Sequence, residues 1–343
     1  WEIIVFRCDG RFEQFLGGGV GNGRIDQILY PFYKNDILNG IIDEKMALEI
    51  LENLWLNIAQ SVTFRQAGNI AHREGLPHFE ATTIGGQDKE GRDATNELTF
   101  LILKSKKEFP LDFPDLAVRI HSRTPERLLY AISELIKEGT GFPKLINDEE
   151  VIPSLLSKGA ELAEARDYAV SGCTEVRMPN RDTYLTGNCQ INLAAALEMA
   201  LNDGKLSLKG NRQFGLATGN AKEFTFEELM NAFKSQVEYI TMHAFIQNQV
   251  IDSIRPSYLA SPFLSSLHDL CMDNCVDIQQ GIIAGGISLG SWDPVGFGTV
   301  VDSLVCLKEV VYEKREVPIG DMLKALECNF NGYEVIHQKC LNA

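Results

Sequence analysis

The residues best suited to chemistry are Cys173 and Glu175, which lie two positions apart in the run Ser171-Gly172-Cys173-Thr174-Glu175. A short apolar strand predicted over residues 168–170 leads straight into this run, so the thiol would stand at the tip of a strand-to-loop turn. The carboxylate of Glu175 could then act as a base toward a substrate hydroxyl held near the sulfur. A conventional cysteine nucleophile needs a histidine beside it, and none lies close in sequence. Spacing alone therefore leaves a structural cysteine as the alternative.

A glycine-rich run over residues 17–24 is a second candidate. Gly18 and Gly23 have the spacing of a phosphate-binding loop. Arg24 and Ile25, however, stand where that loop needs a lysine and a metal-binding hydroxyl. The run is interpreted as a tight loop before a helix or strand.

A third candidate is the set His268, Cys271 and Cys275, which would share one face of a helix predicted over residues 260–277. A closed structural metal site needs a fourth ligand, and none lies nearby in sequence. We therefore predict no metal site and interpret these residues as core or surface positions.

The helices and strands that must position these residues are predicted from the periodicity of hydrophobic residues. Short β-like runs at 116–120 and 168–170 lie between segments with helical spacing. Helices are predicted over residues 44–61, 96–106, 125–138, 149–158, 190–202, 226–250, 260–277, 299–313 and 319–329. Helices that alternate with short buried strands indicate an α/β architecture. No domain boundary stands out.

Composition excludes several classes of protein. The chain has 343 residues, with 32 Lys plus Arg against 47 Asp plus Glu and a net charge of −15. This acidic balance argues against binding to nucleic acid or to an anionic membrane. No run of about 18 apolar residues is present to form a transmembrane helix. Eight scattered cysteines and no signal peptide favour a reducing cytoplasm.

Several longer stretches resemble the glycyl radical enzymes. Residues 23–34 are similar to the family pattern G-R-[FIL]-D-Q-x-x-x-P-[FY]-[YL], and residues 83–98 are similar to T-x-G-G-x-x-x-x-G-x-D-A-x-N-E-L. Further matches follow in family order at residues 119–121, 124–125, 146–149, 165–168, 172–173, 297–304 and 323–333. The likeness spans essentially the whole chain, which is identified as a member of this family.

The resemblance implies a fold and a radical chemistry. The fold is part of a ten-stranded α/β barrel of two half-barrels with surrounding helices, and a loop inside the barrel carries the catalytic cysteine, here Cys173. A second loop carries a glycine that an S-adenosylmethionine-dependent iron–sulfur activase converts to a stable radical. That radical makes the cysteine a thiyl radical, which abstracts hydrogen from the substrate. No tightly bound cofactor is implied.

The residues around the cysteine indicate the subclass. Pyruvate formate-lyases carry two adjacent cysteines, whereas Gly172 and Thr174 flank Cys173 here. The Cys-x-Glu pair instead resembles diol dehydratases, the hydroxyproline dehydratase and lyases that break C–N or C–S bonds, in which the glutamate, here Glu175, removes a hydroxyl proton. We therefore predict a glycyl radical lyase that dehydrates a small hydroxylated metabolite or cleaves its C–S or C–N bond. The alternatives are a formate C-acetyltransferase-like enzyme and a non-catalytic truncated member that acts by binding.

Neighbouring positions bear on the substrate. Glycerol-type dehydratases have an aspartate where this chain has Gly187, preceded by Thr186. Phe79 matches a pocket phenylalanine of hydroxyproline dehydratase and choline lyase, and His78 replaces the aspartate that precedes it in the hydroxyproline enzyme. The resemblance therefore implies Phe79, His78 and Thr186 as substrate-binding residues.

The charges of three residues suggest an anionic substrate. His78, Arg73 and Arg177 could meet a carboxylate or a sulfonate. A solvated or salt-bridged side chain is the alternative for each arginine, and a structural histidine is the alternative for His78.

The family pattern also predicts what lies outside this chain. No R-V-[SA]-G-[YF] radical loop is found, and the family has a helical region before the position of Trp1. Residues 1–343 are therefore expected to form a single partial catalytic domain, inactive alone. The expected partners are a small-molecule substrate, the radical-SAM activating enzyme and a second copy in a homodimer, in the anaerobic cytoplasm.

Overall fold

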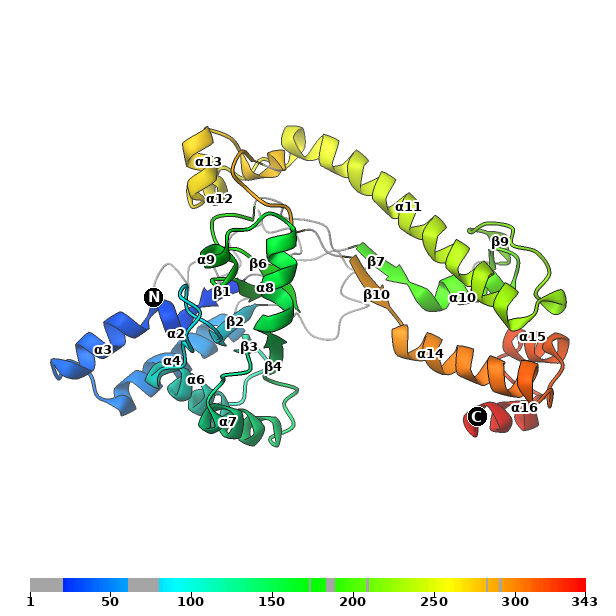
Figure 1. The fold of residues 1–343 in the computed structure, drawn as a ribbon, viewed down its shortest axis with the longest axis horizontal. Coiled ribbons are helices and arrows are strands. Elements are labelled where there is room, and N and C mark those ends of the chain that lie inside the picture. The colour runs from blue at the N-terminus through cyan, green and yellow to red at the C-terminus, as the bar shows by residue number, and fades with distance from the viewer. Residues whose placement is uncertain are drawn as a thin grey trace. The chain divides into compact units, whose positions relative to one another are not determined.

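The computed structural model describes residues 21–60, 80–172, 174–182, 189–207, 210–281, 283–289 and 292–343. The chain divides into two compact units (Figure 1). The first comprises Trp1–Thr186 and Arg255–Leu289, and the second comprises Gly187–Ile254 and Gly290–Ala343.

The first unit is built on a parallel sheet of four strands in the order β1-β2-β3-β4. Its strands are β1 (Gly21–Arg24), β2 (Ala81–Gly85), β3 (Asp115–Ile120) and β4 (Lys144–Asn147). Its helices include α2 (Ile25–Ile28), α3 (Tyr30–Leu38), α4 (Glu44–Ala59), α6 (Glu97–Glu108), α7 (Glu126–Ile136), α8 (Asp148–Ser157) and α9 (Leu162–Ala165). Helices alternate with strands along the chain, as parallel pairing requires.

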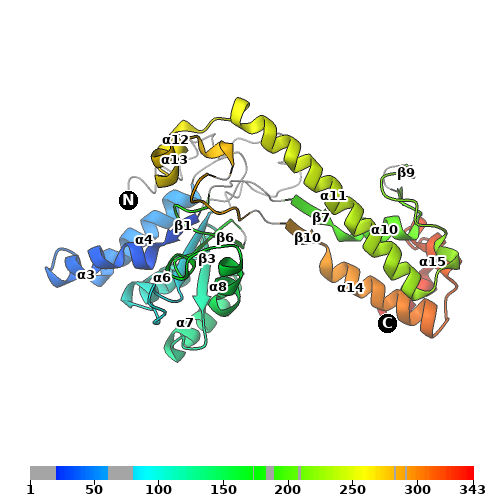
Figure 2. The same cartoon turned by 45° about the horizontal axis from the view of Figure 1, so that its top comes forward.

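The two faces of this sheet carry different side chains. Ile84, Leu116 and Val118 point to one face and pack in a core with residues of α4, α6 and α7. Ala81 and Ala117 lie in a second core with residues of α8. Figure 2 shows α4 and α6 on one side of β3 and α8 on the other. The small side chains on this second face leave room for another element to approach the sheet.

That element is a hairpin of β5 (Ala169–Ser171) and β6 (Glu175–Arg177). The short helices α12 (Pro262–Ser266), α13 (Asp269–Asn274) and η3 (Ile278–Gln280) complete the described part of the unit. The helix predicted over residues 260–277 is wrong. The Asp277 carboxylate accepts from the Ser261 N–H at 2.8 Å, whereas a straight helix would separate these residues by about 24 Å.

Asp26, which belongs to the family-like stretch 23–34, makes hydrogen bonds to other elements of this unit. Its Oδ2 accepts from the Gly85 N–H at 2.8 Å and from the Thr99 hydroxyl at 2.7 Å. Arg24 donates to the Gly85 carbonyl at 2.9 Å. Burial raises the pKa of Asp26 above its ordinary value. The contacts join β1 and α2 to the end of β2 and to α6.

The second unit pairs β7 (Cys189–Asn192) with β10 (Trp292–Val295) in parallel. A helix follows each strand closely, and both pack in one core with the first part of α11. The elements are α10 (Leu193–Leu201), β8 (Lys205–Leu206), β9 (Arg212–Gln213), η2 (Ala221–Glu223), α11 (Phe226–Tyr258), α14 (Phe297–Cys306), a π-helix η4 (Leu307–Glu313), α15 (Ile319–Glu327) and α16 (Glu334–Leu341). Within the described ranges, even the 33-residue α11 does not combine the length and apolarity needed to cross a membrane.

Lys106, near the end of α6, is buried beside Trp55. Its Nζ lies 5.2 Å from the centroid of the indole ring and donates to the Pro114 carbonyl. Burial lowers its pKa to about 7, although the charge of Asp112 acts in the opposite direction. The folded chain therefore holds this amine mostly neutral above pH 7.

We expect the stability of the wild type, relative to Lys106→Met, to rise with pH between about 7 and 10.5. In that window the unfolded chain binds a proton at Lys106 that the folded chain does not, so raising the pH favours folding. Between pH ~8 and ~9.5 the gain should be about 2 kcal/mol. Urea midpoints of both proteins at both pH values give the measurement. A difference that does not change with pH would show that the folded chain keeps the ammonium charged.

Candidate active site

The predicted turn at Cys173 is the connection of the β5–β6 hairpin. Ser171 pairs with Glu175 across the two strands, so Gly172, Cys173 and Thr174 form the loop. Gly172 has φ +60°, in the left-handed region that glycine adopts without strain. Cys173 itself lies outside the described residues.

Glu175 folds back over the turn that carries Cys173. Its Oε2 accepts from the Thr174 N–H at 2.8 Å. The same oxygen lies 2.8 Å from the point that a Cβ on Gly172 would occupy. The backbone thus holds the carboxylate on the three-residue loop. The catalytic roles of Cys173 and Glu175 stay predictions.

The sheet positions this hairpin from one side. Thr83 on β2 accepts a buried hydrogen bond at 2.8 Å from the Val170 N–H through its hydroxyl. Gly21 on β1 lies so close to β5 that a Cβ there would be 2.9 Å from the Val170 carbonyl oxygen. Strand β5 is therefore bound to β2 and packed against β1.

A buried triangle of side chains lies where the chain enters β5. Arg119 on β3 makes a bidentate ion pair with Asp148, with Nε to Oδ1 at 2.8 Å and Nη2 to Oδ2 at 3.0 Å. Its Nη1 donates to the Tyr168 carbonyl at 2.9 Å, and its guanidinium lies 3.8 Å from the centroid of the Tyr168 ring. The Tyr168 hydroxyl closes the triangle by donating to Asp148 Oδ1 at 2.8 Å.

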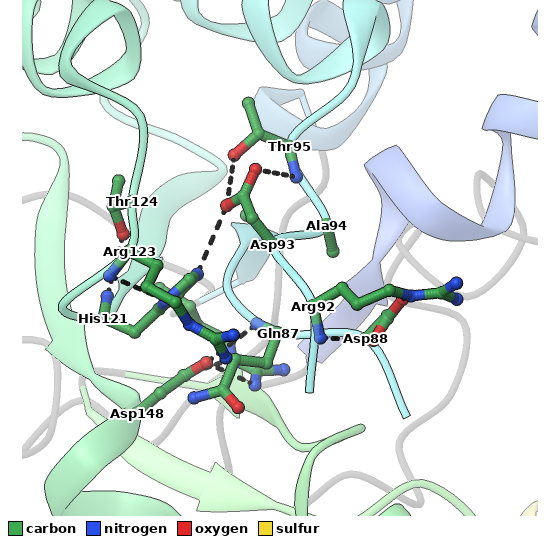
Figure 3. Close-up of polar contacts among 12 residues, drawn as sticks. Gln87, Asp88, Arg92, Asp93, Ala94, Thr95, His121, Arg123, Thr124 and Asp148 are labelled. Carbon is green, nitrogen blue, oxygen red and sulfur yellow. Dashed lines mark hydrogen bonds and ion pairs between the residues drawn. The ribbon is translucent and has the colours of Figure 1, made fainter. Parts of the chain in front are cut away.

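The loop that follows β2 meets the same triangle. The Gln87 N–H donates to Asp148 Oδ2 at 2.8 Å (Figure 3). Asp93 in this loop lies 3.2 Å from Nε2 of His121. Because His121 Nδ1 accepts from the Arg123 N–H, the ring proton belongs on Nε2, which donates to Asp93. Figure 3 shows both contacts. The contacts order the loop at the carboxyl end of the sheet.

Sequence reasoning gave no site role to Thr83, Arg119, Asp148 or Tyr168. The motif matches included them only as family positions. A local feature did mark Arg119, which is a charged residue inside the apolar strand 116–120. For Asp148 the only marker is its position directly after strand β4, which the structure shows.

The remaining predicted site residues are placed as follows. Phe79, His78, Arg73 and Thr186 lie outside the described residues. Arg177 is on β6, and its Nη1 lies 2.7 Å from Asp182 Oδ2. The salt-bridged interpretation of Arg177 is therefore confirmed.

The two weaker motifs do not form sites in the described residues. His268, Cys271 and Cys275 do not share a helix face, because α13 ends at Asn274 and Cys275 takes φ +52°. No three His, Cys, Asp or Glu side chains gather as a metal-binding group in the described ranges. Residues 21–24 of the glycine-rich run form strand β1, and the earlier part of the run lies outside the description.

Comparison with known proteins gives the relatives of the chain. Residues 12–343 match the family model described as pyruvate formate lyase-like. The chain is 53% identical over 340 residues to isethionate sulfite-lyase of Nitratidesulfovibrio vulgaris, covering 98% of this chain and 41% of that protein. It is 34% identical over 318 residues to trans-4-hydroxy-L-proline dehydratase of Clostridioides difficile, covering 92% and 40%.

The fold has solved relatives as well. The glycerol-bound B12-independent glycerol dehydratase of Clostridium butyricum matches with a TM-score of 0.83 and 33% identity, over 94% of this chain and 40% of that one. This likeness confirms the predicted fold class, part of the α/β barrel of these enzymes. The chain spans about two fifths of the length of the relatives it matches. Because the family match covers nearly all of it, the chain belongs to the pyruvate formate-lyase-like family of glycyl radical enzymes.

Proposed function

We propose that the protein containing this chain is a glycyl radical lyase that cleaves the C–S bond of isethionate, 2-hydroxyethanesulfonate, and releases sulfite. The reaction type is supported by one geometric observation, the Glu175 carboxylate held over the turn of Cys173. The substrate is supported by 53% identity to an isethionate sulfite-lyase, against 34% to the hydroxyproline dehydratase.

The proposed reaction uses both residues of the turn. A glycyl radical on a segment outside residues 1–343 supplies the one-electron chemistry that makes Cys173 Sγ a thiyl radical. Cys173 Sγ takes a hydrogen atom from the carbon that bears the hydroxyl, and Glu175 accepts the hydroxyl proton. The carbon–sulfur bond then breaks and sulfite departs. The remaining carbon radical takes the hydrogen atom back from Cys173, which leaves acetaldehyde and regenerates the thiyl radical.

The sulfonate has to be held by groups other than Glu175, since two anions repel each other. We assign this task to His78 and Arg73, with Phe79 and Thr186 lining the same pocket. Arg177 is already bound to Asp182. Guanidinium suits a sulfonate because its planar donors match the oxygens of the anion.

The remaining proposals concern the complete protein. Residues 1–343 would be one partial catalytic domain, inactive alone, in a cytoplasmic homodimer served by a radical-SAM activase. Family membership supports the activase and the dimer. Met242, Phe245 and Ile246 on α11 are at least half exposed, which supports an additional part of the protein covering them.

The test uses the full-length protein with its activase under anaerobic conditions. Electron paramagnetic resonance first measures the glycyl radical, and sulfite and acetaldehyde are then measured with isethionate as substrate. We expect both products in equal amounts, and no turnover of trans-4-hydroxy-L-proline or glycerol. A protein with full radical that dehydrates either of these, or forms formate from pyruvate and coenzyme A, would contradict the proposal. Failure to form any radical would favour the non-catalytic alternative.

A further inference from the structure

The Arg119–Asp148–Tyr168 triangle places two charged side chains in a protein core, where charged residues are rarely fully buried. Arg119 and Asp148 are both fully buried, so both ions lose their hydration. A buried ion pair of this kind is often no more stabilising than well-packed apolar residues of the same volume. A fully bonded polar network does, however, specify one arrangement of the groups that it joins. The triangle is therefore better explained by the geometry it fixes than by the stability it adds.

What the triangle fixes is Tyr168, the residue immediately before β5. Tyr168 is held by its carbonyl, by its ring face and by its hydroxyl. Burial raises the pKa of this hydroxyl well above its ordinary value, so it remains a donor to Asp148. Two residues later, the Val170 N–H is held by Thr83. The strand that leads to Cys173 is thus anchored at two alternate residues, which sets its register against the sheet.

We propose that the Arg119–Asp148–Tyr168 triangle is a positioning device for Cys173, which fixes the entry of β5 and with it the place of the thiol on the hairpin. Hydrogen transfer needs the reacting atoms within about 3–3.5 Å, and a misplacement of about 1 Å can cost ~100-fold in rate. None of the three residues has to touch the substrate for this role. The kinetic part of the test rests on the proposed function, whereas the chemical-labelling part does not.

The decisive variant is Tyr168→Phe in the full-length protein, which removes the hydroxyl and keeps the ring and the carbonyl. The matched control is Ser105→Ala. Ser105 Oγ accepts from Trp55 Nε1 at 2.8 Å in the helix-side core of the same unit, away from the hairpin. The control leaves the buried Trp55 Nε1–H without its acceptor, so it too is a destabilising change in the core. Urea midpoints of both variants establish that each is folded.

The first readout is the rate at which iodoacetamide alkylates Cys173 in the unactivated protein, measured by mass spectrometry of its peptide. The exposed thiols of Cys275 and Cys328 serve as internal references. We expect Tyr168→Phe to change the rate at Cys173 severalfold relative to the references, and Ser105→Ala to leave it unchanged. Equal behaviour of the two variants at Cys173 would overturn the inference, because the triangle would then act on stability alone.

The second readout is turnover of isethionate by the activated protein. We expect Tyr168→Phe to lower kcat by at least ~10-fold with an unchanged KM and unchanged radical content. The deuterium isotope effect, with deuterium on the hydroxyl-bearing carbon, should increase because hydrogen abstraction becomes more limiting. If wild-type protein with full radical does not cleave isethionate, the proposed function fails while the labelling comparison still tests the positioning role. If Tyr168→Phe does not fold in buffer alone, both variants are compared again in sucrose, which favours the folded state.

Discussion

Replacing Cys173 by Ser in the complete protein is expected to abolish sulfite release, by more than about 10⁴-fold, while the glycyl radical still forms. The physical reason is bond strength. An S–H bond is weak enough for the sulfur to take and return a hydrogen atom in each cycle, whereas an O–H bond is too strong for serine to serve in this way. Radical content by electron paramagnetic resonance and sulfite production, measured on the same sample, provide the check.

Cys275→Ser supplies the matched control for this substitution. Its thiol is exposed at the end of α13 and has no part in the hairpin. We expect this variant to keep the turnover of the wild type. Retained turnover in Cys173→Ser would remove Cys173 from the mechanism and return it to the structural interpretation.

Glu175→Gln is expected to lower kcat by about 10²- to 10⁴-fold, the usual contribution of a general base. The amide keeps the size of the side chain but cannot accept the hydroxyl proton. Hydrogen abstraction by Cys173 does not need this base, so the first step should survive. In deuterium oxide, the variant should therefore still introduce deuterium into unreacted isethionate, which mass spectrometry detects, while sulfite release is lost.

The control for Glu175→Gln is Glu228→Gln. Glu228 also places a carboxylate oxygen on a backbone N–H, that of Thr225 at 2.7 Å, but it lies at the start of α11 in the second unit. Unchanged turnover in Glu228→Gln would show that loss of this type of contact is tolerated. Normal sulfite release in Glu175→Gln would contradict the role of Glu175 as the base.

Local patterns predicted the elements better than they predicted the site. The strand expected at residues 116–120 and the helix expected at 96–106 are present, because the hydrophobic periodicity that predicts them acts within a few residues. The helix expected over 260–277 is wrong because Asp277 binds back to Ser261. Hydrophobic periodicity does not predict a hydrogen bond between residues 16 positions apart.

In the candidate site, too, residues close in sequence could be predicted to lie together, whereas residues distant in sequence could not. Cys173 and Glu175 are two residues apart, so their association could be read directly from the sequence. Thr83 is 87 residues from its partner Val170, and Arg119 is 29 residues from Asp148. These pairs meet only because β2, β3 and β5 lie together in the fold. Spacing along the sequence therefore cannot identify the groups that position the hairpin, although it does single out Cys173 and Glu175 as the predicted pair.

The crowded turn at Gly172 limits which residues position 172 can accept. A side chain at position 172 and the carboxylate reaching back from position 175 would occupy the same space, and a residue other than glycine would also strain the left-handed backbone. A larger residue at 172 therefore requires both a strained backbone and a displaced Glu175 carboxylate. Under selection for turnover we therefore expect position 172 to remain glycine, and a substitution there to persist only together with a change at position 175.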